Sequence, residues 1–317
     1  MKSVVVGFGG AFPKKCVTNE ELSERLDTSD EWISSRTGIK QRYVIQNEES
    51  TSTLAAKAAF DALEFAGMSP SDIDLIVLGT TTGDYTFPAT ACLVQKALGI
   101  ENECAAFDVS AACSGFLYAL DIADSAIKSG KAKNALVIGA DCFSKILNWE
   151  DRASCVLFGD GAGAVVLKGE QNSDKGVQYC KIHANGKFSD MLITTGGVST
   201  TQQAGFVSMQ GRDVFKFAVE KFRESFERLL ADNNLTIDDI DLVVPHQANI
   251  RIIMMLAEVM KLPKEKVLVT IDKHSNTSAA TIPLALNEVK DSLIGKGYVV
   301  LLSMGAGFTW GAALIKM

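Results

Sequence analysis

The chain has 317 residues, of which 47% are apolar and 22% charged, and its formal net charge is −7. These proportions are typical of a soluble globular protein with room for one large or two medium domains. No apolar run approaches the roughly 18 residues that a membrane span needs, and the negative charge argues against a general nucleic-acid-binding protein.

The start of the chain runs directly into a strand-like pattern, without the basic and apolar regions of a signal peptide, so we expect a cytoplasmic protein. Seven scattered cysteines without a C-x-x-C pair indicate free thiols in a reducing compartment. The three histidines are not spaced as zinc ligands, so no metal site is expected. Residues 7–10 (Gly-Phe-Gly-Gly) are not a dinucleotide fingerprint, because Phe12-Pro13 follows where a helix would have to begin.

In the first half, strand-like and helix-like patterns alternate. Apolar spacing and cap residues predict a strand over 3–9, short helices over 20–26 and 30–35, a helix over 51–67, a buried strand over 75–79 and a helix over 89–98. A buried strand ending at 105–107, a helix over 116–127 and a buried strand over 135–139 follow. Residues 156–167, interrupted by Phe-Gly-Asp-Gly-Ala-Gly, predict two strands around a tight turn.

The second half repeats this order. Residues 238–244 resemble residues 71–77, and each segment follows an amphipathic helix (214–233 and 51–67). The strands expected over 299–303 and 310–315 correspond to those over 135–139 and 161–167. A further strand is expected over 267–271. Such a repeat indicates a duplication. We therefore expect an α/β protein with similar lobes at 1–170 and 171–317, divided in the polar stretch 170–176. A pseudo-twofold axis between the lobes would bring Cys113 opposite the turn around Asn276.

The stretch Asp-Val-Ser-Ala-Ala-Cys113-Ser-Gly-Phe lies where a strand passes into a helix. Small residues allow a tight turn and close approach by a ligand. Unpaired N–H groups and the helix dipole would favour the thiolate of Cys113, which indicates a nucleophile. The alternative is a buried structural cysteine.

Two polar clusters follow strands in the second half. One is Val-Pro-His246-Gln-Ala-Asn249, and the other is His274-Ser-Asn276-Thr-Ser-Ala-Ala. A buried histidine with one hydrogen bond is the alternative for His246, and a helix N-cap is the alternative for Asn276. His183 is interpreted as structural, and His274 is left outside the catalytic set.

Together these three motifs resemble those of β-ketoacyl-acyl carrier protein synthase III, a thiolase-fold enzyme family that starts bacterial fatty-acid synthesis. The similarity runs collinearly from Thr28-Ser-Asp-Glu-Trp-Ile33 to the closing Gly305-Ala-Gly-Phe-Thr-Trp-Gly311. The resemblance implies an acyltransferase with two duplicated mixed-sheet lobes in layered αβαβα order. It also implies a homodimer that uses acyl-CoA and malonyl-acyl carrier protein and needs no cofactor beyond the coenzyme A thioester.

The family chemistry assigns a role to each motif. The Cys113 thiolate would attack a short acyl-CoA to form an acyl-enzyme. Malonyl-acyl carrier protein would then lose CO₂ while His246 and Asn276 donate hydrogen bonds to its thioester oxygen. The resulting carbanion would attack the acyl group, with the oxyanion held by the backbone N–H groups of Cys113 and Ala306.

The resemblance also implies three sets of substrate-binding residues. Coenzyme A would be bound by Thr28, Trp32, Arg36, Arg152, Phe215 and Asn249, with Trp32 and Arg152 on either side of the adenine. The acidic carrier protein would contact Arg212, Lys216 and Arg251. The acyl pocket would consist of Thr81, Phe87, Phe143, Phe158, Leu192 and Met304, with Phe87 reaching in from the other subunit.

Some positions depart from the family pattern. Glu258 and Val259 stand where basic residues are common, so carrier docking would be weaker or shifted. Met304 replaces a common aromatic residue and Phe143 a common leucine, which leaves the length and branching of the primer open.

Three other functions were weighed. Papain-like proteases share the order Cys…His…Asn, but the duplication and the glycine-rich closing motif argue against that class. A condensing enzyme of the same fold could make a specialised product, such as a quinolone or a polyketide starter. A non-catalytic acyl-CoA-binding relative would lack Cys113, His246 or Asn276, and all three are present.

Overall fold

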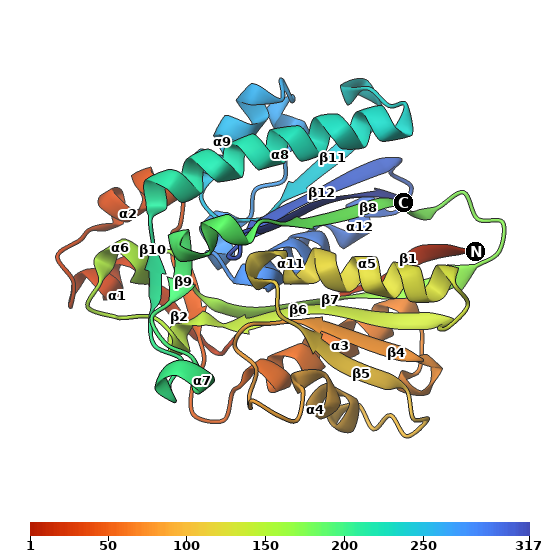
Figure 1. Cartoon of the computed structure of the whole chain (residues 1–317), viewed down its shortest axis with the longest axis horizontal. Helices are drawn as coiled ribbons and strands as arrows, with labels where there is room; N and C mark the ends of the chain where they lie inside the picture. Colours follow the sequence, from red (N-terminus) through yellow and green to blue (C-terminus); the bar gives the residue numbers. More distant parts are fainter.

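Two mixed β-sheets build the protein in the computed structural model, which describes residues 1–317 (Figure 1). The first has the order β1 (Lys2–Ala11), β7 (Asp160–Glu170), β6 (Asn134–Cys142), β4 (Leu75–Gly79), β5 (Ala105–Val109). The second has the order β8 (Gly176–Ala184), β13 (Thr309–Lys316), β12 (Tyr298–Gly305), β11 (Ile240–Pro245). In both, the first two neighbouring pairs are antiparallel and the next pair is parallel. The second sheet thus repeats the topology of the first, without a counterpart of β5.

Helices cover both faces of each sheet. Helices α5 (Gly115–Lys128) and α11 (Thr281–Glu288) lie between the sheets, where α5 contacts β4, β6 and β8 and α11 contacts β1 and β7. Helices α3 (Thr51–Ala66) and α4 (Thr90–Ala97) cover the outside of the first sheet, and α8 (Gly211–Asn233) with α9 (Ile250–Val259) the outside of the second. The αβαβα layering in Figure 1 confirms the predicted fold. Strands covered on both faces are largely apolar, as in β4 and in Val299–Leu302 of β12.

Short elements connect these layers. Strands β2 (Lys15–Thr18) and β3 (Gln41–Val44) form a two-stranded antiparallel sheet, and so do β9 (Leu192–Thr194) and β10 (Val207–Met209). The short helices are α1 (Asn19–Ser23), α2 (Asp30–Thr37), α6 (Arg152–Cys155), α7 (Val198–Thr201), α10 (Ile271–His274) and α12 (Lys290–Leu293). The 3₁₀ turns are η1 (Pro70–Asp72), η2 (Ala112–Ser114), η3 (Phe143–Lys145), η4 (Gly186–Met191), η5 (Ile237–Asp239), η6 (Lys264–Lys266) and η7 (Ser278–Ala280). No helix combines the length and the apolar composition needed to cross a membrane.

The expectation of two strands within 156–167 is wrong. One strand, β7, begins only at Asp160, and Phe158 forms an isolated bridge to Asn276. Asn276 N–H donates to Leu157 O (3.1 Å), and Gly159 N–H donates to Asn276 O (3.1 Å). The residues before β7 therefore pair with the turn of the second half that carries Asn276.

The strand expected over 267–271 is also wrong. Val267 forms only an isolated bridge to Val243, and α10 begins at Ile271. One backbone bond joins the segment to β11, from Leu268 N to Val243 O (2.9 Å), and the Gln247 side chain binds it further, because its Oε1 accepts from Thr270 N (2.8 Å) and its Nε2 donates to Leu268 O (3.1 Å). A single bridge and a side-chain amide therefore cover this edge of the second sheet.

Strand β5 is not buried, contrary to expectation. It lies at the edge of the first sheet, and Phe107 is 37% exposed. The apolar composition of β5 correctly predicted a strand. It did not predict that this strand would be partly exposed on the surface of the single chain.

Candidate active site

Cys113 lies in the 3₁₀ turn η2, between β5 and α5. Ala112, immediately before it, has a left-handed backbone (φ 46°), which a residue other than glycine adopts at a cost in energy. The second half of the chain holds this turn in place, since Ser303 Oγ on β12 donates to Cys113 O (2.7 Å). A Cβ on Gly305 would lie 2.6 Å from Cys113 N, so only glycine permits this approach. The closing glycine motif therefore packs directly against the cysteine.

The Cys113 thiol is protonated at neutral pH. Burial raises its pKa to about 12, because desolvation disfavours the charged form, while the Ser278 hydroxyl lowers it and the nearby Asp141 carboxylate raises it. The effect of the helix start, which was expected to favour the thiolate, is therefore not the dominant one. The N-terminus of α5 favours negative charge on the sulfur, but desolvation outweighs it.

His246 follows β11 directly and is buried. Its backbone N–H donates to Leu302 O (2.7 Å), and its Nδ1 lies 2.6 Å from Thr281 Oγ1. Burial lowers its pKa to about 3. The imidazole is therefore neutral at physiological pH and carries a single N–H hydrogen.

Asn276 is fixed at both its backbone and its side chain. Besides the backbone pairing with Leu157 and Gly159, its Oδ1 accepts from Ser278 N (2.9 Å). Thr277 holds the N-cap position of the following 3₁₀ turn η7, so Asn276 is not its N-cap, although the Asn276 side chain binds the first N–H of that turn. Because Oδ1 is occupied, Nδ2 is the end of the amide that is available to a ligand.

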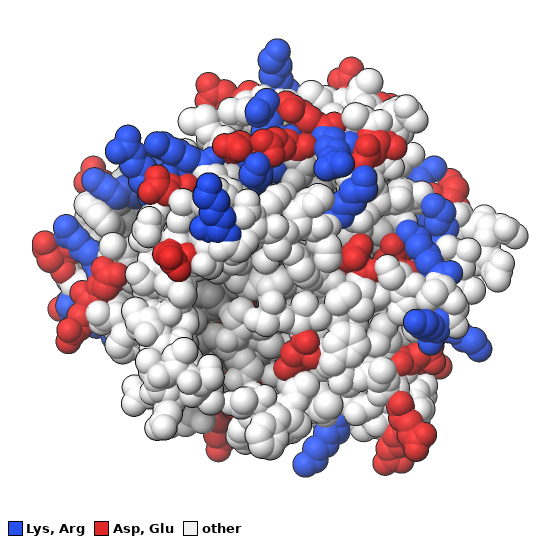
Figure 2. Space-filling view, viewed as in Figure 1, with Lys and Arg blue, Asp and Glu red and all other residues white.

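Cys113, His246 and Asn276 line one cavity of about 180 Å³, although they come from opposite halves of the chain. The predicted residues Phe158, Leu192, Phe215, Asn249 and Met304 line it as well. A second, largely apolar cavity of about 590 Å³ also reaches Cys113 and is lined by Thr81, Phe143, Phe158, Leu192 and Ala306, among others. Figure 2 shows this face of the molecule hollowed below α8, among uncharged residues. The thiol thus lies where two cavities meet.

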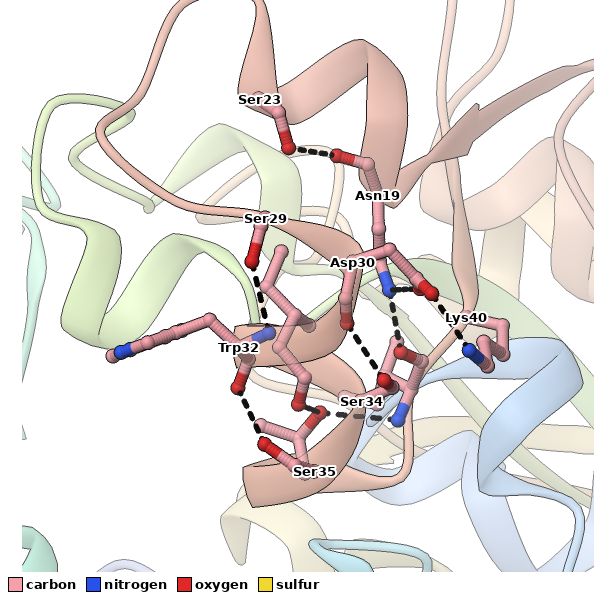
Figure 3. Close-up of polar contacts among 11 residues, drawn as sticks. Asn19, Ser23, Ser29, Asp30, Trp32, Ser34, Ser35 and Lys40 are labelled. Carbon is pink, nitrogen blue, oxygen red and sulfur yellow. Dashed lines mark hydrogen bonds and ion pairs between the residues drawn. The ribbon is translucent and has the colours of Figure 1, made fainter.

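Trp32 is held on α2 by a polar network (Figure 3). Ser29 Oγ accepts from Trp32 N (3.1 Å) and caps the helix. The Asp30 carboxylate accepts from Asn19 Nδ2 (2.8 Å) and from Lys40 Nζ (2.8 Å), which anchors α2 to its neighbours. The indole points away from this network, as Figure 3 shows.

Two guanidinium groups lie on the Trp32 ring. Arg36 is 4.5 Å and Arg152 is 5.0 Å from the ring centroid, whereas the resemblance implied Trp32 and Arg152 on either side of an adenine and Arg36 near the phosphates of coenzyme A. Arg152 also donates to Asp27 Oδ2 (3.1 Å). Thr28 Oγ1, nearby in the chain, is buried without a hydrogen-bond partner. These residues line neither cavity, so they form a separate surface cluster.

The remaining predicted residues are exposed. Arg212 and Lys216 lie on the first turns of α8, and Arg251 lies on α9, where its Nη2 donates to Ser35 O (3.3 Å). Lys and Arg gather near this end of α8 in Figure 2. Phe87 is 83% exposed and lies outside both cavities.

Several residues that support the site were not predicted from the sequence. Thr281 contacts His246, Ser278 orients Asn276, and Gln247 anchors the segment before α10. Buried Asp141 accepts from Thr81 N (2.8 Å), which holds a cavity-lining loop. The signal for Asp141 was a carboxylate at the end of an apolar strand. No cluster of three His, Cys, Asp or Glu side chains is arranged to bind a metal.

Comparison with known proteins gives full-length similarities. The family model described as 3-oxoacyl-[acyl-carrier-protein (ACP)] synthase III matches residues 107–186, and its C-terminal counterpart matches 230–317. A protein of Rhizorhabdus wittichii named beta-ketoacyl-[acyl-carrier-protein] synthase III is 56% identical over 317 residues, which is 99% of each chain. One of the same name from Erythrobacter litoralis is 54% identical, over 100% of this chain and 99% of the relative. A crystal structure of 3-oxoacyl-[acyl-carrier-protein] synthase III from Aquifex aeolicus superposes with a TM-score of 0.93 at 46% identity, covering 99% of this chain and 100% of that one.

Proposed function

Because the chain belongs to the 3-oxoacyl-(acyl-carrier-protein) synthase III family, we propose that Cys113, His246 and Asn276 condense an acyl-CoA primer with malonyl-acyl carrier protein. The chain is a condensing acyltransferase that initiates fatty-acid synthesis. One observation supports the residue assignment above all: a thiol, a neutral imidazole and a carboxamide from opposite halves line a single cavity. Residues 1–170 would contribute the nucleophile and 171–317 the two donors.

The first half-reaction is a thioester exchange at Cys113. Because the thiol is protonated, its proton leaves as the S–C bond forms and ends on the departing CoA sulfur, which leaves an acyl-Cys and a free CoA thiol. The backbone N–H groups of Cys113 and Ala306 would stabilise the tetrahedral oxyanion. The adjacent N-terminus of α5 also favours negative charge on the sulfur.

The second half-reaction uses the two side-chain donors. As the C–C bond to the carboxylate of malonyl-acyl carrier protein breaks and CO₂ leaves, the electron pair moves onto the thioester oxygen. His246 and Asn276 Nδ2 would donate to that oxygen, where the charge develops. The carbon then attacks the acyl-Cys, and the released Cys113 thiolate regains a proton from water.

Residues outside the catalytic trio would bind the two substrates. Trp32, Arg36 and Arg152 offer stacking and positive charge for the nucleotide end of coenzyme A, with Thr28 beside them. Phe215 and Asn249 line the inner cavity, where the pantetheine arm would lie. Arg212, Lys216 and Arg251 provide local positive charge for an acidic carrier protein on a chain of net charge −7.

The apolar cavity would hold the acyl group. Thr81, Phe143, Phe158 and Leu192 line it together with Cys113, while Met304 lines the smaller cavity. We assign no cofactor beyond the thioester substrate. The seven free cysteines fit a reducing, cytoplasmic compartment.

We also propose a homodimer paired along β5. This edge strand exposes Phe107, and the nearby Phe87 is available to enter the partner's acyl pocket. The specialised condensing enzyme is not favoured, because the relatives that are 54% and 56% identical to this chain are both named beta-ketoacyl-[acyl-carrier-protein] synthase III.

The test is a two-stage incubation. Acetyl-CoA should add one acetyl group to Cys113, and malonyl-acyl carrier protein should then yield a 3-oxoacyl product. Acylation at another thiol, or no product after decarboxylation, would contradict the assignment. A panel of acyl-CoA primers of increasing length and branching, with products identified by mass, would define the pocket.

A further inference from the structure

The hydroxyl of Thr281 has one hydrogen but lies within hydrogen-bonding distance of two possible acceptors. Its Oγ1 lies 2.6 Å from His246 Nδ1 and 3.1 Å from Ser278 O. Both Thr281 and His246 are only 2% exposed, so water does not compete freely for these contacts. The hydroxyl can donate to only one of the two atoms at a time.

The choice determines which nitrogen of His246 carries its hydrogen. If Thr281 donates to Nδ1, the neutral ring must carry its hydrogen on Nε2. If Thr281 donates to Ser278 O, Nδ1 must be the donor to Oγ1, and Nε2 is left with a bare lone pair. A bare Nε2 would repel the negatively charged oxygen that His246 is proposed to stabilise.

The surrounding bonds favour donation to the ring. Ser278 O already accepts the backbone N–H of Thr281, the bond that closes η7, so it does not need the hydroxyl. No other hydrogen bond reaches His246 Nδ1, and the contact to the ring is the shorter of the two.

We propose that Thr281 is a positioning residue that donates its hydroxyl hydrogen to His246 Nδ1 and thereby holds the imidazole in the Nε2–H tautomer. This inference rests on the proposed role of His246 as a hydrogen-bond donor. Asn276 is oriented by the same device, because Ser278 N–H occupies its Oδ1 and leaves Nδ2 to donate. The turn from Asn276 to Thr281 therefore fixes the donor end of both groups that face the developing oxygen charge.

The tautomer can be measured directly on the unmodified enzyme. Long-range ¹H–¹⁵N spectra of protein labelled with ¹⁵N-histidine distinguish a protonated ring nitrogen from one with a lone pair, and the spectrum of His246→Gln identifies the His246 signals. We expect a protonated Nε2 and an Nδ1 that accepts a hydrogen bond. A protonated Nδ1 would overturn the proposal. This result does not depend on activity, so it is separable from the proposed function.

Matched variants test the consequence. Thr281→Val keeps the shape but removes the hydroxyl, and we expect it to lower malonyl decarboxylation roughly 10- to 100-fold while Cys113 acylation continues. Thr281→Ser should restore the rate. In a His246→Ala background, Thr281→Val should cause no further loss, since its effect passes through the ring. Equal losses in both half-reactions, or no rescue by serine, would contradict a positioning role.

Discussion

Replacing Asn276 by alanine would separate the two half-reactions. Asn276→Ala removes the Nδ2 donor, and loss of one preorganised oxyanion donor costs about 10²–10³ in kcat, or about 2.7–4 kcal/mol. It also removes the Oδ1 that accepts from Ser278 N at 2.9 Å. An N–H group left buried without a partner costs about 1–3 kcal/mol of unfolding free energy. We therefore expect slower decarboxylation and a less stable protein, but continued acylation.

Asn276→Asp is the matched control. Its carboxylate can still accept from Ser278 N–H but offers no N–H donor, so decarboxylation should fall while the Ser278 bond persists. Mass spectrometry of acetylated Cys113 measures the first half-reaction, and CO₂ released from malonyl-acyl carrier protein measures the second. If acylation and decarboxylation fell by the same factor in both variants, Asn276 would support only the architecture of the site, contrary to this prediction.

Three further predictions concern the thiol and the two binding surfaces. Alkylation of Cys113 by iodoacetamide should rise about tenfold per pH unit between about pH 7 and about pH 10, because burial raises the pKa to about 12; a plateau in that range would show a more acidic thiol. Trp32→Ala should raise KM for acyl-CoA roughly tenfold through lost stacking but leave turnover of an acyl-pantetheine unchanged, and an equal effect on both substrates would place Trp32 outside nucleotide binding. Arg251→Glu should raise KM for malonyl-acyl carrier protein at low salt, and Glu258→Lys should lower it; insensitivity of both to salt would argue against electrostatic docking.

The elements that depend on local periodicity were predictable from sequence. The strand expected over 75–79 is observed as Leu75–Gly79, and the helix expected over 51–67 as Thr51–Ala66. The two halves of the chain also show the predicted order of strands. This order could be predicted because strands covered on both faces appear in the sequence as apolar runs.

What failed depends on contacts between distant segments. Residues 267–270 have the composition of a strand, but only Leu268 N pairs with β11, and the Gln247 side chain binds Thr270 N and Leu268 O. Phe158 leaves the expected strand because it pairs with Asn276, more than a hundred residues away. No local pattern encodes these long-range contacts.

The site, like the fold, was predictable only in part. The motifs pointed to Cys113, His246 and Asn276, which line one cavity. The protonation of the thiol was mispredicted, since the helix start was visible in the sequence but the depth of burial was not. Thr281 carries no distinctive signal in a run of small polar residues, and only its distance from the ring identifies it.

The unequal edges of the two sheets have a consequence for self-association. A duplicated fold with an open edge on each half could join head to tail, copy after copy, into a filament. Here the edge strand β11 of the second sheet is covered by the segment that Gln247 binds, whereas β5, at an edge of the first sheet, has no neighbouring strand on its outer side. In the proposed homodimer β5 would pair with its own twofold image, and because this would occupy the edge, assembly through it would stop at two chains.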